Sequence, residues 1–263
     1  YGETGFTIEV PDHCTTVVQP TYVQGLAGED EAISNAIRNP IGMNSLSTLV
    51  RSDQTVVISV PDITRPMPSK VVLGALFREL GHIPREQVTI IVATGTHRSN
   101  SPQELEAMLG EGVVSRYQVV NHDGFTRAGL KRVGDTVGGI PVWINRFWIE
   151  ADFRITIGFV EPHFFAGFSG GPKMVAPGLA GIDTIMGLHS ASMIGHPNAV
   201  WGITQGNPVH DSIREIALDT GVDFSIDVTI NRDHAITTVY AGELLSVHTA
   251  SCQVAKRTAM KNV

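Results

Sequence analysis

Short runs of apolar residues, most of them β-branched, recur along the chain. Continuous apolar runs of this length are typical of strands that are buried on both faces of a parallel sheet. The four runs that fit this description are TVVISV at 55–60, VTIIVA at 88–93, YQVVN at 117–121 and RITIGF at 154–159. Each is therefore predicted to be a buried strand.

The segments between these runs carry apolar residues at helical spacing. Residues 68–80 place Val72, Leu76 and Leu80 on one helical face, and residues 102–109 follow Ser101, a typical N-cap. The alternation of strands and helices predicts an α/β fold with an open, mostly parallel sheet and flanking helices. Ligands of such folds bind beyond the carboxyl ends of the strands.

The two ends of the chain add elements to this sheet. Residues 1–25 are predicted to be extended, and residues 29–38 to form a helix that packs against the sheet edge. A helix is predicted over 208–217, followed by a small C-terminal β-hairpin over 223–242. A final helix is predicted over 243–260.

Composition narrows the class of protein. The chain has 263 residues, 42% of them hydrophobic, which supplies a substantial core. Its net charge of −7 and the lack of a basic cluster argue against a nucleic-acid partner and favour a small molecule. Two cysteines exclude a disulfide framework and favour a reducing cytoplasm. No apolar run reaches the length of a membrane span, and no signal peptide is predicted. The first residue is Tyr1 and not Met, so the alternative that an N-terminal leader has been removed stays open.

Chemically versatile side chains follow three of the predicted strands. Asp62 and Arg65 lie in PDITRP, His97 in ATGTHR and His163 in EPHFF. Arg65 is suited to clamp a carboxylate or phosphate, although an ordinary loop ion pair explains it as well. Neutral imidazole is both a metal ligand and a general base near pH 7. His97, His163 and a later histidine, His189, are therefore candidates for either role, against the alternative of ordinary structural histidines.

A glycine-rich segment, residues 161–181, surrounds Lys173. Glycine lets the backbone approach a ligand closely, which indicates a binding loop, although a plain surface lysine is the competing interpretation. The segment is not a Walker loop, because Pro172 and Met174 flank the lysine. The backbone amides around Ser169–Gly171 are instead predicted to form an anion-binding nest for a phosphate.

Taken together, PDITRP, ATGTHR, EPHFFAGFSGGPKMVAPGLAG and GLHS resemble the corresponding segments of the lactate racemase family, whose members use a nickel-pincer nucleotide. That family has a histidine ten residues before its cofactor lysine and another sixteen residues after it. His163, Lys173 and His189 meet this spacing. The resemblance runs from about residue 57 to residue 211.

The resemblance implies a role for each of these residues. Lys173 would hold the nickel-pincer nucleotide covalently through a thioamide, and His189 would bind the nickel. His97 and His163 would be the catalytic acid and base, one on each side of a 2-hydroxy acid. The other implied contacts are Asp62, Thr64, Ser169, Gly170 and Gly171 with the cofactor, and Arg65, His97 and His163 with the substrate.

The implied activity is that of an isomerase, a racemase or epimerase that moves the α-hydrogen of a 2-hydroxy acid as a hydride. Removing the hydrogen as hydride while a base takes the hydroxyl proton gives a planar 2-keto acid. Hydride return to either face then gives either enantiomer. The resemblance also implies two kinds of protein partner, the enzymes that make the cofactor and those that insert nickel.

One family feature has no counterpart in this sequence. Members carry a second α/β lobe with a Tyr-Gln-x-x-Lys segment that closes on the substrate. Residues 1–263 are therefore predicted to be one cofactor-binding lobe, either a fragment or a minimal relative. Two alternatives remain open: a cofactor-binding module that is inactive alone, and a hydrolase in which His97, His163 and His189 hold zinc.

Overall fold

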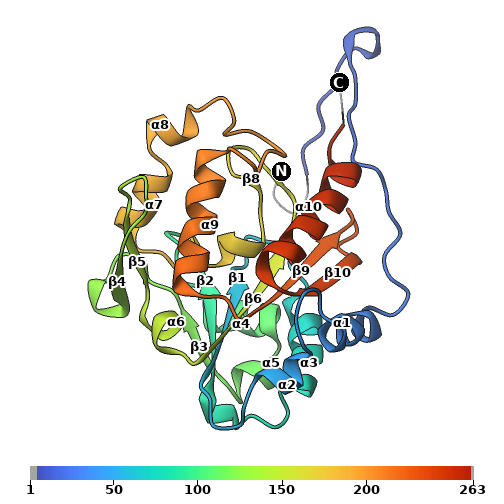
Figure 1. Ribbon diagram of the computed structural model, residues 1–263. Coiled ribbons are helices and arrows are strands. Elements are labelled where there is room, and N and C mark those ends of the chain that lie inside the picture. The colour runs from blue at the N-terminus through green and yellow to red at the C-terminus, as the bar shows by residue number, and fades with distance from the viewer. Residues whose placement is uncertain (1–4, 262–263) are drawn as a thin grey trace.

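A six-stranded sheet forms the centre of the computed structural model, which describes residues 5–261 (Figure 1). The strand order is β10–β9–β6–β1–β2–β3, and neighbours are parallel except for β9 and β10. These strands are β1 (Val56–Pro61), β2 (Val88–Ala93), β3 (Gln118–Asn121), β6 (Phe153–Phe159), β9 (Phe224–Ile230) and β10 (Ile236–Gly242). Two small antiparallel pairs lie outside this sheet: β4 (Leu130–Asp135) with β5 (Pro141–Asn145), and β7 (Pro162–His163) with β8 (Gly167–Phe168).

Helices cover both faces of the sheet. One face carries α1 (Glu29–Arg38), α2 (Leu46–Leu49), α3 (Ser69–Glu79), α4 (Pro102–Leu109) and α5 (Glu111–Val114). The other carries α6 (Arg146–Glu150), the 3₁₀ turn η5 (Gly171–Met174), α7 (Ile182–Leu188), α8 (Ala191–Ile194), α9 (Pro208–Thr220) and α10 (Leu244–Ala259). No helix among residues 5–261 is long and apolar enough to cross a membrane.

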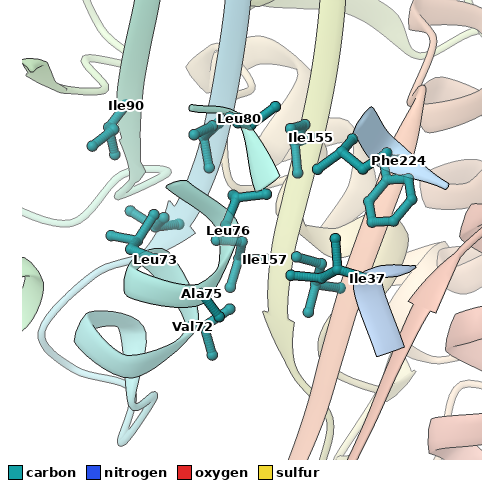
Figure 2. Packing of buried hydrophobic residues seen from close by; sticks show 14 of the residues in the cluster. Ile37, Val72, Leu73, Ala75, Leu76, Leu80, Ile90, Ile155, Ile157 and Phe224 are labelled. Atoms are coloured by element: carbon teal, nitrogen blue, oxygen red, sulfur yellow. The ribbon is translucent and has the colours of Figure 1, made fainter. Parts of the chain in front are cut away.

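The apolar runs seen in the sequence are buried on both faces, as parallel strands in an α/β fold require. Within β1, Ile58 faces the core under α3, whereas Val57 faces the core under α9. Figure 2 shows the first of these cores, where Leu73 and Leu76 of α3 pack against strand residues such as Ile155. Burial of these side chains is the main favourable contribution to folding.

Leu76→Ala is expected to lower the free energy of unfolding by about 2–5 kcal/mol, because Leu76 is completely buried and its removal leaves a cavity in a packed core. Urea unfolding followed by circular dichroism measures the change. Lys70→Ala, on the exposed side of the same helix, is the control and should shift stability by no more than about 0.5 kcal/mol. Equal effects of the two substitutions would contradict this account of the core.

The strands and helices predicted from the hydrophobic pattern are confirmed, most of them to within one residue. Ser101 does cap α4, in a capping box with Glu104. The predicted hairpin, β9–β10, is also present. It is not a separate small element, however, because β9 pairs in parallel with β6 and extends the main sheet.

The structure differs from the prediction in two places. The β4–β5 hairpin was not predicted, although β5 contains Val, Trp and Ile and a turn through Gly138 and Gly139 joins the two strands. The extended segment over residues 5–20 is present as predicted, but it forms no strand within the described residues and projects from the body as an exposed arm (Figure 1). At its base, the Thr21 amide donates to the carbonyl of Thr258 at the end of α10.

Candidate active site

A cavity of about 560 Å³ lies where the loops after β1, β2 and β6 meet η5 and α7. This is the carboxyl end of the parallel strands, where the α/β fold is expected to bind ligands. The cavity brings together most of the residues predicted from the sequence, namely Asp62, Arg65, His97, His163, Ser169, Gly170, Lys173 and His189. Thr64 and Gly171, which were predicted to contact a cofactor, do not line it.

Asp62 holds the ring of His97. Its Oδ2 atom lies 2.7 Å from His97 Nδ1, and its Oδ1 atom accepts a hydrogen bond of 2.6 Å from the hydroxyl of Thr64. The carboxyl group is buried, whereas the His97 side chain is 55% exposed. Because a carboxylate accepts, Nδ1 carries the proton and Nε2 keeps its lone pair. His97 is therefore set to act as a base, and the Thr64 hydroxyl helps to position Asp62.

His163 is held in the opposite tautomer. Its Nδ1 atom accepts from the backbone N–H of Ala166 at 3.2 Å, so in the neutral ring Nε2 carries the proton. The ring stacks on Phe164 and meets Phe165 edge-on. Burial, together with the nearby charges of Lys173 and Arg65, lowers the pKa of His163 to about 3. The two histidines therefore differ, since His97 offers a lone pair and His163 offers an N–H group.

Lys173 projects into the cavity from η5. No hydrogen bond or ion pair joins its amine to another residue in the described part of the chain, and the centre of the Phe165 ring lies 5.9 Å from it. Burial and, to a smaller extent, the charge of Arg65 lower the pKa of the Lys173 amine to about 7, against the opposing effect of Glu161. A large fraction of this amine is therefore neutral and nucleophilic near pH 7.

Arg65 lies at the cavity wall in an ion pair with Glu161, with 2.9 Å between its Nη1 atom and Glu161 Oε1. Both interpretations of Arg65 from the sequence are thus correct in part, since it makes a loop ion pair and also faces the cavity. Glu161 was not predicted as a site residue. The signal available was its position, because it follows β6 within two residues and stands two before His163.

His189 ends α7 and meets Phe165 edge-on at 5.0 Å between ring centres. Its Nδ1 atom lies 2.7 Å from the carbonyl oxygen of Ile185 and donates to it. This bond fixes the tautomer and leaves the Nε2 lone pair free. Histidines that bind metals in proteins have this arrangement, with the second ring nitrogen bonded to a carbonyl or carboxylate.

The anion nest predicted at Ser169–Gly171 is not formed. The Ser169 amide donates to the carbonyl of Glu161 at 2.9 Å, and the Gly171 amide donates to Asp227 Oδ1 at 3.0 Å. The hydroxyl of Ser169 is also used, by the carbonyl of Phe159. These two amides and the hydroxyl donate to acceptors within the protein, so they are not directed at a phosphate.

The three histidines do not form a metal site of their own. Within residues 5–261, no group of three or more His, Cys, Asp or Glu side chains is placed to hold a metal ion. The zinc hydrolase alternative therefore loses its geometric basis.

Comparison with known proteins finds one family. The sequence profile described as "Lactate racemase N-terminal domain" matches residues 1–202. A lactate racemase of Thermoanaerobacterium thermosaccharolyticum is 33% identical over 267 residues, covering 100% of this chain and 62% of its own length. A lactate racemase of Lactiplantibacillus plantarum is 36% identical over 237 residues, covering 90% of this chain and 56% of its own length. The chain thus spans about three fifths of the length of these relatives.

Solved structures have the same fold. The lactate racemase apoprotein of Thermoanaerobacterium thermosaccharolyticum superposes with a TM-score of 0.86 at 31% identity, over 98% of this chain and 61% of its own. A Thermotoga maritima protein superposes with a TM-score of 0.72 at 23% identity, over 89% of this chain and 60% of its own. The second similarity concerns the fold alone.

Proposed function

The chain belongs to the lactate racemase family, and from this premise we propose that it is the cofactor-binding lobe of a racemase or epimerase of a 2-hydroxy acid. Both curated relatives are named lactate racemase, and racemases are isomerases. The proposal extends to a cytoplasmic location and to partners that make the cofactor and insert nickel.

The observation that carries this proposal is the Lys173 amine, which faces the cavity without a partner among the described residues. A buried amine with a pKa of about 7 is suited to form a covalent bond with a carboxyl-derived group. His189, with its free Nε2 atom, lines the same cavity and is suited to bind nickel. These residues fit the nickel-pincer nucleotide of the family, with Lys173 as the attachment point and His189 as the metal ligand.

When bound, this cofactor would supply hydride-transfer chemistry for the α-hydrogen of the substrate, with Lys173 and His189 as the residues that would hold it. The protein handles the proton of the substrate hydroxyl. His97, oriented by Asp62, accepts that proton at Nε2 and returns it.

His163 and Arg65 hold the two oxygen-bearing groups of the substrate. His163 is neutral near pH 7, so its Nε2–H group is placed to donate to the hydroxyl or keto oxygen. A bound carboxylate and a neutralised Lys173 would raise the pKa of His163 and let it exchange a proton as well. The remaining donors of the Arg65 guanidinium are suited to the substrate carboxylate.

The alternative is a cofactor-binding module without activity of its own; the chain covers 62% of the length of the first relative and 61% of the solved structure. One preparation separates the two functions. Protein produced together with the cofactor-synthesis and nickel-insertion enzymes is analysed by intact mass, nickel content and racemisation of a 2-hydroxy acid. Adduct and nickel with racemisation support the enzyme, and adduct and nickel without racemisation support the module.

His189→Ala is expected to lose most of the bound nickel while the organic adduct stays on the protein, since the imidazole is assigned to the metal and not to the covalent bond. Metal analysis and intact mass on the same sample measure the two quantities separately. His196→Ala, an exposed histidine on the segment after α8, is the matched control and should retain nickel. Full nickel content in His189→Ala would overturn the assignment.

A further inference from the structure

The loop over residues 169–171, called the glycine loop below, has the cavity on one side. On its other side lies a buried group of polar side chains that the proposed chemistry does not use. Its members come from α9, β9 and α10, and each is at most 8% exposed. They are His210, Asp227, His248, Ser251 and Cys252. Burying this many polar groups costs free energy unless they make specific bonds, so their contacts need an explanation.

Asp227 bonds to the loop backbone directly. Its Oδ1 atom accepts from the amide of Gly171 at 3.0 Å, and the side chain is fully buried. Burial raises the pKa of this carboxyl group, which favours the neutral acid. Its Oδ2 atom has no partner among the described residues. Among the described residues, the hydrogen bond from the Gly171 amide is thus the contact that offsets the cost of burying the Asp227 carboxyl group.

His248 bonds to the same loop from α10. Its Nε2 atom lies 3.0 Å from the carbonyl oxygen of Ser169 and donates to it. One helical turn further along, the thiol of Cys252 contacts the His248 ring. The two ends of the three-residue stretch 169–171 are therefore held by side chains from two different elements.

The glycines of the loop make room for these two side chains. Gly170 and Gly171 both have positive φ, +74° and +47°. A Cβ atom on Gly171 would lie 2.5 Å from the His248 ring, and one on Gly170 would lie 3.2 Å from Asp227 Oδ1. Bare backbone is thus required on the buried side of the loop as well as on the cavity side.

We propose that Asp227 and His248 are positioning residues that anchor the loop from behind and thereby fix the direction in which η5 presents the Lys173 amine. Lys173 lies two residues beyond Gly171 in the same turn, and its own amide donates to the carbonyl of Gly170. Movement of the anchored backbone is therefore transmitted to the lysine. The inference rests on the proposed function only in treating this amine as the attachment point.

The test measures the protonation of Lys173 in the chain purified without cofactor. Acetic anhydride labels neutral amines, and the extent of labelling at Lys173 against pH, from peptide mass spectrometry, gives a midpoint expected at about 7. If the anchors fix the amine between Arg65, Glu161 and His163 in a place shielded from water, their loss exposes it. The midpoint should then rise by about one pH unit or more in Asp227→Ala and His248→Phe, toward the ordinary lysine value.

Asp227→Asn should keep the wild-type midpoint, because the amide has an oxygen that can accept from the Gly171 amide as Asp227 Oδ1 does. Two further substitutions remove buried hydroxyls from the same elements without touching the loop, Ser225→Ala in β9 and Ser251→Ala in α10. Both should also leave the midpoint unchanged. Circular dichroism establishes that each variant is folded.

The proposal is overturned if folded Asp227→Ala and His248→Phe keep the wild-type midpoint, or if Asp227→Asn behaves like Asp227→Ala. Should Asp227→Ala not fold, His248→Phe decides the question, because it keeps an aromatic ring at this position and removes the nitrogen that donates to the Ser169 carbonyl. No cofactor takes part in the labelling. A failure to find an adduct on Lys173 would therefore count against the proposed function and leave this test unaffected.

Discussion

Lys173→Ala is expected to abolish covalent cofactor attachment completely, with no adduct detectable by intact mass in protein produced with the cofactor-synthesis and nickel-insertion enzymes. Among the residues 5–261 that line the cavity, Lys173 supplies the only amine, so none of these neighbours can replace it. The fold should be retained, because the alanine removes a cation that no described residue pairs and leaves both apolar cores intact.

Two controls make this result specific. Lys173→Arg keeps a positive charge at the site but has no nucleophilic amine at neutral pH, and it should also lack the adduct. Lys70→Ala removes an exposed amine on α3 and should carry the adduct at wild-type level. An adduct of unchanged mass on Lys173→Ala would move the attachment elsewhere and remove the main support for the proposed function.

His97→Ala and His163→Ala are each expected to slow racemisation by roughly 10²- to 10⁴-fold, the usual cost of removing an acid/base group. Both directions must slow together, because the equilibrium constant links kcat/KM for the two enantiomers. His13→Ala, an exposed histidine on the N-terminal arm, is the control and should leave the rates unchanged. The measurement uses the full-length gene product and initial rates from each enantiomer.

The fate of an α-deuterium in the substrate separates two mechanisms in the same assay. Transfer as hydride predicts that the label stays largely with the product. Removal as a proton by two histidines predicts exchange of the label with water. Rapid exchange, with nickel content unaffected by His189→Ala, would favour the proton mechanism and contradict the roles given to Lys173 and His189.

The hydrophobic pattern was sufficient to predict the sheet, because strands buried on both faces leave long apolar runs that few other structures explain. The same pattern placed His97 and His163 at one edge, since parallel strands present their carboxyl ends together. It could not show that β9 joins β6. A strand pairing across 69 residues depends on packing that neither segment encodes alone.

The histidine tautomers and the residues that anchor the loop could not be predicted from the sequence for a similar reason. His97 and His163 are the same residue type, yet Asp62 on a different loop fixes one ring and the amide of Ala166 fixes the other. The predicted phosphate nest failed because an acid 56 residues away, Asp227, occupies the Gly171 amide. The chemical role of these histidines and of the Gly171 amide therefore depends on their hydrogen-bond partners, which residue type alone does not identify.

The position of the loop anchors in the chain has a consequence for the order in which the protein matures. The bonds from the loop to Asp227 and His248 span 56 and 79 residues, so both anchors leave the ribosome after Lys173. At about 5–20 residues per second, translation delivers His248 several seconds later than the lysine it helps to orient. During that interval the lysine sits on an unanchored segment. If Asp227 and His248 orient Lys173 as proposed, the amine reaches its final geometry only after α10 has been made and has docked.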